Sequence, residues 1–280
     1  SLLSLARLMP VTATIHHPMT VDRRLAIQGA PSFVKKLQAI RWYTFISMQK
    51  SVARRLSGII TVSDSSKKDI AAEYQIPESR FITIPIGIDL DNFYPIPAIK
   101  KQPGRIIVTN SADTPLKGLH HLLFAVKSIV QKRPVKLVVI GSPKKGGPIE
   151  KLVKTLDLAR YITFTGRIDH DAFVKEYARA SIAVVPSLYE GFGLPVGEAM
   201  ACRTPVISTT GGALPEVAGD AAKLVPPGNA NALAAAILEL LDDPAQREAF
   251  AEKGYQRVLN EFTWEKCAIR TARVYKDLIH

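Results

Sequence analysis

Short runs of β-branched residues alternate with longer segments of helical periodicity along almost the whole chain. Such runs stand, for example, at 11–15, 58–62, 136–140 and 182–186, and amphipathic segments separate most of them. Strands that alternate with helices are typical of βαβ units, in which crossover helices join parallel strands. The sequence therefore predicts an α/β protein built on parallel sheets.

These patterns fall into two successive groups. The first, within 1–95, has expected strands at 11–15, 58–62 and 81–84, a long helix over 31–56 and a helix at 64–74. A stretch rich in Pro, Gly and Asp at 85–97 then breaks the periodicity and marks the expected domain boundary. Three strands leave the first domain an incomplete Rossmann-like unit.

The second group, within 96–262, contains enough strands for a doubly wound Rossmann-like domain. Strands are expected at 105–109, 136–140, 161–165, 182–186, 205–208 and 222–225, with helices near 118–131, 149–158, 171–179, 195–202, 212–218, 230–241 and 245–260. A last helix within 263–280 is expected to pack back toward the first domain.

The charge of the chain is positive and unevenly distributed. Lys and Arg number 37 and Asp and Glu 25, for a net charge of +12, and residues 1–60 hold nine basic residues and one acid. The electrostatic field of such an excess of positive charge favours anionic partners. No zinc-finger spacing or aromatic stacking motif points to nucleic acid. The apolar stripe of the helix at 31–56 is expected in the core, and its basic side leaves peripheral membrane contact open.

Two cysteines, Cys202 and Cys267, stand outside any metal-binding or disulfide spacing. This usage favours a reducing compartment and hence a cytoplasmic protein, with the inner face of a membrane as an alternative location. No apolar run reaches the roughly 18 residues of a membrane-spanning helix.

The densest motif is PSLYEGFGLPVGE at 186–198. It follows an expected strand, and Pro195 suits the first position of a helix. Amides of Phe192, Gly193 and Leu194, together with the positive end of that helix, would suit a diphosphate. The carboxylates of Glu190 and Glu198 flank this turn and can accept hydroxyl protons from a sugar and a ribose. The alternative is a tightly packed βα turn without a ligand.

The E-x7-E spacing of Glu190 and Glu198 within PSLYEGFGLPVGEAMACRTPVIST resembles the donor-site signature of glycosyltransferase family 4, the retaining group 1 type with the GT-B fold. PIGID at 85–89, TGR at 165–167, GGALPEV at 211–217 and FTW at 262–264 agree with it. The resemblance implies two Rossmann-like domains, of which this chain would lack the start of the first.

The resemblance also assigns roles to individual residues. Glu190 would hydrogen-bond the donor sugar and Glu198 the ribose, while Gly191, Phe192, Gly193 and Leu194 would surround the diphosphate. Gly166, Arg167 and Ile168 resemble the segment that meets the nucleobase, and Ser142 lies in a flexible basic loop that faces either the donor or solvent.

Lys117 precedes Gly118, where an expected helix opens on the carboxyl side of a strand, and it resembles the lysine that clasps the diphosphate. The family usually has an arginine where Ser111 stands here, so one charge is lost. On the other side of the expected cleft, His16 resembles the acceptor-side histidine, with His17 as a second candidate and a packed loop histidine as the alternative.

No metal site or cofactor is expected. Asp89 and Asp91 form a DxD pattern, but it lies in the hinge stretch, where short acids serve turns. His120 and His121 are adjacent and are expected to point apart.

We therefore expect a retaining transfer of a sugar from a nucleoside diphosphate donor to a hydroxyl acceptor, either lipid-linked or a saccharide. A non-catalytic nucleotide-sugar-binding fragment, a GT-B relative such as a sugar-nucleotide epimerase or a phosphorylase, and a basic RNA- or membrane-binding protein are the alternatives.

Overall fold

The computed structural model describes residues 8–30, 32–109 and 114–279, and the chain divides into two compact units. One comprises Ser1–Pro85 with Glu265–His280, and the other Ile86–Trp264. This division falls at the start of the expected boundary stretch of 85–97, before the expected domain limit at residue 95. The reason is that the stretch following Pro85 packs within the second unit, where the buried Phe93 ring meets His170 and Phe173 edge-on, with centroids 4.9 and 5.6 Å away.

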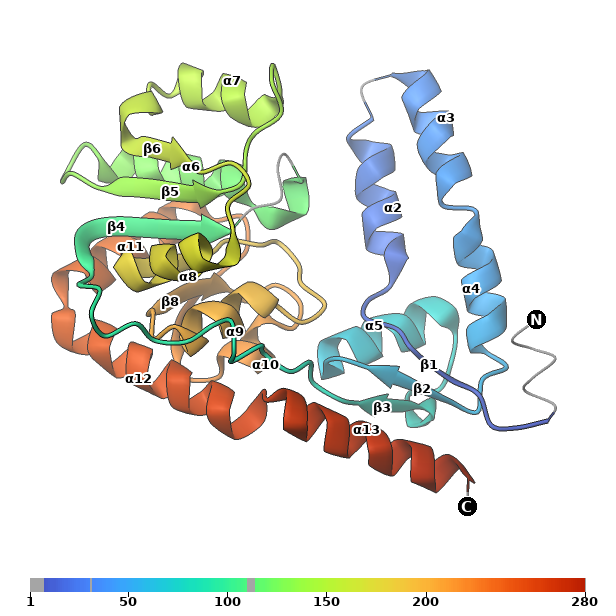
Figure 1. Ribbon diagram of the computed structural model, residues 1–280. Helices are drawn as coiled ribbons and strands as arrows, with labels where there is room; N and C mark the ends of the chain where they lie inside the picture. The colour runs from blue at the N-terminus through green and yellow to red at the C-terminus, as the bar shows by residue number, and fades with distance from the viewer. Residues whose placement is uncertain (1–7, 31, 110–113, 280) are drawn as a thin grey trace. The chain divides into compact units, whose positions relative to one another are not determined.

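The second unit is built on six parallel strands in the order β6-β5-β4-β7-β8-β9 (Figure 1). These are β4 (Gln102–Thr109), β5 (Lys136–Ile140), β6 (Ile162–Phe164), β7 (Ala180–Val185), β8 (Val206–Thr209) and β9 (Ala222–Val225). Successive strands proceed outward from β4 on one side and from β7 on the other. The connections after β4 and β7 therefore lead to strands on opposite sides of the sheet, and doubly wound sheets bind ligands at such a switch point.

Helices cover both faces of this sheet (Figure 1). On one face lie α6 (Leu119–Ile129) and α11 (Ala230–Asp242), whose Leu122, Leu123 and Ile237 are fully buried in the main core. On the other lie α8 (His170–Arg179) and α9 (Leu194–Ala201). The remaining elements are η2 (Pro115–Lys117), α7 (Pro148–Thr155), η3 (Ala159–Tyr161), α10 (Leu214–Ala218) and α12 (Pro244–Glu261).

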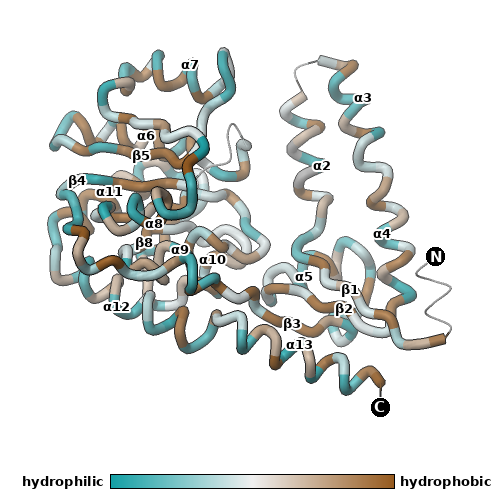
Figure 2. Tube along the Cα trace, in the orientation of Figure 1, coloured by the Kyte–Doolittle hydropathy of each residue, from teal (hydrophilic) through white to brown (hydrophobic). Residues whose placement is uncertain are grey.

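Strands of this sheet are hydrophobic because both of their faces are covered. Figure 2 shows β4 and β5 brown over much of their length. Side-chain caps fix where several helices begin: Asp169, Asn229 and Asp243 each accept a hydrogen bond from the amide three residues later, at 2.7, 2.9 and 2.8 Å. Each such cap stabilises its helix by about 0.5–2 kcal/mol.

In the first unit, β1 (Thr12–Thr14), β2 (Gly58–Thr61) and β3 (Phe81–Thr83) form a parallel sheet in that order. The helix α5 (Asp64–Tyr74) follows β2, and η1 (Glu78–Arg80) precedes β3. The last helix, α13 (Trp264–Ile279), places Val274 in a buried cluster with Ile60 and Ile84. Its Leu278 lies against Gly58, so the end of the chain completes the core of this unit.

The prediction of one long helix over 31–56 is wrong. The structure has α3 (Phe33–Trp42) and α4 (Phe45–Ala53), and α2 (Met19–Gln28) precedes them. Tyr43 and Thr44 separate the two helices, and the Thr44 hydroxyl donates to the Arg41 carbonyl at 2.9 Å. Aromatic and β-branched residues at 42–45 favour such a break, because they lose rotamer freedom in a helix.

The expectation that the apolar stripe of this segment belongs to the core is also wrong for most of it. The side chains of Phe33, Leu37 and Met48 are 74, 50 and 64% exposed, and α3 buries no residue. Only Ile46 and Ala53 of α4 are buried.

Candidate functional site

The candidate site lies at the carboxyl ends of β4 and β7, which are neighbours in the sheet. The loop after β4 and the loop after β7 are joined directly, because the Leu188 amide donates to the Leu116 carbonyl at 2.7 Å. Gly118 makes this approach possible. Its φ is +68°, and a Cβ there would lie 1.9 Å from the Pro186 carbonyl oxygen, so no other residue fits.

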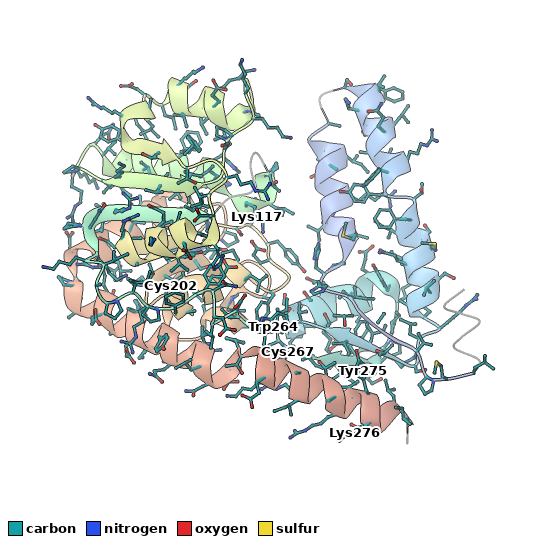
Figure 3. The ribbon with its side chains drawn as sticks, viewed as in Figure 1. Lys117, Cys202, Trp264, Cys267, Tyr275 and Lys276 are labelled. Carbon is teal, nitrogen blue, oxygen red and sulfur yellow. The ribbon has the colours of Figure 1, made fainter. Side chains whose placement is uncertain are left out.

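Lys117 and Glu190 meet across this junction. The Lys117 ammonium donates to both carboxylate oxygens of Glu190, at 2.8 and 3.0 Å, and the Ser187 hydroxyl donates to Oε1 at 2.7 Å. The Glu190 side chain is 12% exposed and the Lys117 side chain 32%. A cation and an anion, 73 positions apart in the chain, thus meet at the carboxyl ends of β4 and β7, and Lys117 is labelled at the right of the sheet in Figure 3.

The backbone of Glu190 is supported by the loop before α10. The Ala213 amide donates to the Glu190 carbonyl at 2.9 Å. A Cβ at Gly212 would lie 2.3 Å from that same oxygen, and one at Gly211 would lie 2.4 Å from the Leu188 carbonyl oxygen. From the sequence, the segment with Gly211 and Gly212 stands out only through its resemblance to the glycosyltransferase family. The paired glycines were the available signal, since they mark a close approach of backbone.

The turn leads into α9 as the sequence predicts, except that the helix begins at Leu194, so Pro195 is its second residue rather than its first. Gly193 caps the helix with φ +108°, which favours glycine, and Pro195 occupies the first turn. Leu194 is 39% exposed, while the Phe192 side chain is 5% exposed and packs edge-on against Phe262. Phe192 therefore contributes its side chain to packing, a role that the sequence did not reveal.

Glu198 sits in the first turns of α9 in a different environment from Glu190. Burial raises its pKa to about 7, and the hydrogen bond from the Tyr177 hydroxyl and the charges of His170 and Lys117 only partly offset this. The Tyr177 oxygen lies 3.5 Å from Oε2. Glu198 can therefore act as a hydrogen-bond donor or acceptor near neutral pH.

Ser142 and Gly166 lie side by side at the carboxyl ends of β5 and β6. The Gly166 amide donates to the Gly141 carbonyl at 3.1 Å, and a Cβ at Gly166 would lie 3.5 Å from the Ser142 hydroxyl. Arg167 is exposed and Ile168 half-buried in the segment that follows. These residues share the sheet edge with Lys117 and Glu190. Ser111 lies outside the described residues.

His16 follows β1 in the first unit and is exposed, and His17 is half-buried. Because they belong to the unit that does not contain Glu190, their contact with a donor sugar stays a prediction.

In the described part of the chain, no three His, Cys, Asp or Glu side chains lie where they could hold a metal ion together. Asp89 accepts from the Asn92 backbone and side-chain amides at 3.2 and 2.6 Å, as a turn residue does. The expectation that His120 and His121 point apart is wrong, since their ring centroids are 3.8 Å apart. Rotamer choice at the start of α6 brings adjacent rings together.

Among the described residues, both cysteines are free, and no helix has the length and hydropathy required to cross a bilayer.

Two family descriptions match the sequence. "Glycosyl transferases group 1" matches residues 95–257, and "Glycosyltransferase Family 4" matches residues 1–92. The MMP alpha-(1->4)-mannosyltransferase of Mycolicibacterium hassiacum is 37% identical over 99% of this chain and 68% of its own length. O-antigen chain mannosyltransferase B of Escherichia coli is 30% identical over 82% of this chain and 64% of its own.

Solved structures agree with these matches. Sucrose-phosphate synthase from Thermosynechococcus elongatus superposes with a TM-score of 0.75 at 30% identity, over 95% of this chain and 67% of that one. Anabaena Alr3699/HepE, solved with UDP and glucose, gives 0.79 at 18% identity, over 98% of this chain and 73% of that one, and so supports the fold. The expected α/β, GT-B fold class is confirmed, and the chain belongs to the group 1, family 4 glycosyltransferases.

Proposed function

We propose that this glycosyltransferase moves a sugar, with retention of configuration, from a nucleoside diphosphate to a hydroxyl group of its acceptor. The observation that carries the proposal is the Lys117–Glu190 ion pair at the carboxyl ends of the neighbouring strands β4 and β7. A crevice at this point of a doubly wound sheet is the expected place for a nucleotide, and the pair puts a cation for phosphate beside a carboxylate for hydroxyls.

Lys117 would hold the diphosphate together with the start of α9. Two of its three N–H donors account for the bonds to Glu190, and the third remains for a phosphate oxygen. The amides of Phe192, Gly193 and Leu194 stand at the start of α9, where the helix dipole favours an anion. As the bond between sugar and phosphate breaks, negative charge grows on the diphosphate, and donors already in place stabilise it without rearrangement.

Glu190 would orient the sugar. Its carboxylate is held by Lys117 and Ser187, so it presents remaining lone pairs to sugar hydroxyls from a fixed position. The same two bonds reduce its strength as a nucleophile, because they stabilise the negative charge that would attack carbon. This supports a mechanism in which the diphosphate departs and the acceptor hydroxyl attacks on the same face of the sugar. The leaving diphosphate takes the proton of the acceptor hydroxyl.

Glu198 would bind the ribose. A group whose pKa is raised to about 7 by burial suits a pair of hydroxyls that both donate and accept. Ser142, Gly166, Arg167 and Ile168 lie along the same edge of the sheet, on the side of β5 and β6, and would line the nucleobase.

The names of the relatives suggest the donor. The proteins of M. hassiacum and E. coli are called mannosyltransferases, and a Corynebacterium glutamicum relative, 31% identical over 70% of this chain, is called GDP-mannose-dependent. GDP-mannose is therefore the first donor to test. The acceptor, lipid-linked or saccharide, and a cytoplasmic or membrane-peripheral location stay predictions.

Saturation-transfer NMR of the whole chain with GDP-mannose, UDP-glucose and ADP-glucose tests donor binding without an acceptor. We expect the base and ribose protons of one donor to receive saturation, and Glu198→Gln to weaken that signal. A matched variant, Glu239→Gln, removes an exposed glutamate of α11 and should leave it unchanged. Absence of signal from all three donors would contradict the proposal. Donor binding without sugar transfer to any acceptor would favour a non-catalytic binding unit.

A further inference from the structure

A cavity of about 260 Å³ opens at the amino edge of the sheet in the second unit. Lys101 directly precedes β4, Pro205 directly precedes β8, and Ser181 lies at the start of β7. β4 runs for eight residues, about 26 Å at 3.3 Å per residue. Its arrow in Figure 1 points away from this edge and toward the edge where Figure 3 labels Lys117. The cavity is therefore separate from the candidate donor site.

Positive charge prevails in the lining. Lys101, Arg133 and Arg247 contribute three cations and Glu248 one carboxylate, which leaves a net charge of +2. Asp242 pairs with Arg133 but is itself largely exposed. A partly enclosed space with several cations and few anions concentrates small anions from solution.

Lys101 has only neutral partners. Its ammonium donates to the Ala180 carbonyl at 3.2 Å and to the Thr204 hydroxyl at 3.5 Å, and Thr204 is fully buried. Within the described part of the chain, no carboxylate lies at ion-pair distance from it. Its pKa is lowered to about 8, because burial disfavours the ammonium more than the charges of Cys202 and Glu248 favour it. An anion at this point would restore the charged form.

Hydrogen bonds hold the Arg247 guanidinium in place and leave some of its N–H donors available. Its Nη1 donates to the carbonyls of Leu240 and Leu241 at the end of α11, at 2.6 and 2.8 Å. Its Nε and Nη2 make no hydrogen bond to any described residue. A guanidinium that is held rigidly at one nitrogen is well prepared to bind an oxyanion with the others.

Most of the remaining lining is apolar, and the volume of the cavity limits the size of the ligand. Leu241, Ala251 and three prolines contribute carbon surface beside the cations. A volume of 260 Å³ is below the roughly 300–1,000 Å³ typical of pockets for drug-sized ligands. We propose that this cavity is a second ligand site, which binds a small phosphate monoester with its phosphate between Lys101 and Arg247. It would act independently of the proposed donor site.

The test is a ¹H–¹⁵N NMR titration of the whole chain with inorganic phosphate and with a hexose 6-phosphate, at constant ionic strength. We expect saturable shifts at the amides of Gly104 and Ser181, and stronger binding of the ester than of phosphate. The unphosphorylated hexose should cause no shift there. Shifts confined to Gly193 and Leu194 would place the anion at the donor site and overturn the proposal.

Two substitutions that change the charge of the lining should change the affinity for the phosphate ester in opposite directions. Lys101→Gln should weaken binding about tenfold, the change expected for one charge-assisted hydrogen bond. Glu248→Gln should strengthen it about threefold, because a like charge is removed. A variant that merely disturbed the fold could not produce this gain. The control Lys154→Gln alters an exposed lysine of α7 and should change nothing. If Lys101→Gln and Glu248→Gln both left the affinity unchanged, or if chloride caused equal shifts, the cavity would hold an adventitious ion only and the proposal would be overturned.

Discussion

The ring of Phe262 meets the ring of Phe192 edge-on, with centroids 5.7 Å apart and planes at 87°. Phe192 belongs to the turn that begins α9, and Phe262 lies just before the chain leaves the second unit. The Phe262 carbonyl accepts from the Ile88 amide at 2.7 Å, and a Cβ at Gly197 would lie 2.4 Å from the Ile88 side chain. The turn and α9 thus rest on the two segments by which the chain enters and leaves this unit.

Phe262→Leu should weaken binding of a nucleoside diphosphate several-fold, because the edge-on contact that positions Phe192 is lost. Such a contact is worth about 0.5–1.5 kcal/mol beyond its buried area. Phe250→Leu, on α12 and packed against the main core, is the matched control. It should lower the free energy of unfolding to a similar extent and leave nucleotide affinity unchanged. Calorimetric titration together with urea unfolding would measure both quantities, and equal losses of affinity in the two variants would contradict the coupling.

Gly212→Ala should reduce sugar transfer more than it reduces stability. Gly212 has φ +61°, and the added Cβ would lie 2.3 Å from the Glu190 carbonyl oxygen, so the loop that carries Glu190 must shift. Gly146→Ala provides the comparison, because Gly146 has φ +70° with open space around it. Both substitutions carry the left-handed penalty of about 1–2 kcal/mol, but only the first displaces Glu190. Steady-state kinetics should show a lower kcat for Gly212→Ala alone, and equal kcat values would refute this role.

Glu198 should make stability depend on pH. Burial raises its pKa to about 7 in the folded chain from a usual 4.5, so the folded state binds the proton more tightly than the unfolded state. The contribution of this group to stability is therefore largest below pH 4.5 and is lost as pH rises through about 7.

The comparison of the native chain with Glu198→Gln isolates this effect, because His120 and His121 titrate in the opposite sense. Burial lowers their pKa values, so their contribution to stability increases as pH rises. From pH 5 to pH 8 the native chain should lose about 1–3 kcal/mol relative to the variant in urea unfolding. A constant difference between the two would show that Glu198 is ionised throughout.

Lys117→Met should weaken binding of a nucleoside diphosphate about tenfold or more, since one charge-assisted bond to the phosphates is lost. Lys127→Met, on the following helix α6, is the control, because no described contact joins Lys127 to Glu190. Isothermal titration with GDP and UDP is the measurement. A Lys117→Met chain that binds both nucleotides as the native chain does would remove Lys117 from the diphosphate site.

Much of the second unit could be predicted because its sequence obeys local rules. Strands such as β5 and β9 are short, mainly apolar runs between turn residues, and both lie where the sequence places them. In the first unit, the helix α5 at Asp64–Tyr74 likewise begins where its sequence predicts, after the capping Ser63. At these places, local preference and burial agree.

The failures have tertiary causes. One turn at Tyr43 and Thr44 divides the predicted long helix, although the apolar spacing continues across it. The Lys117–Glu190 pair depends on a contact between loops 73 residues apart, and the support from Gly212 depends on a third loop. Spacing within one segment cannot report such contacts. The left-handed glycines at Gly118 and Gly212 were the nearest signal.

The most direct test of the account compares Glu190→Gln with Glu239→Gln in sugar transfer and in nucleotide binding. Glutamine keeps the size of Glu190 but removes the charge that pairs with Lys117. We predict that kcat with the preferred nucleotide sugar falls about a hundredfold or more, while the affinity for the free nucleoside diphosphate changes less than threefold. Glu239→Gln should match the native chain in both. Full transfer activity in Glu190→Gln would contradict the assignment of Glu190 to the donor sugar.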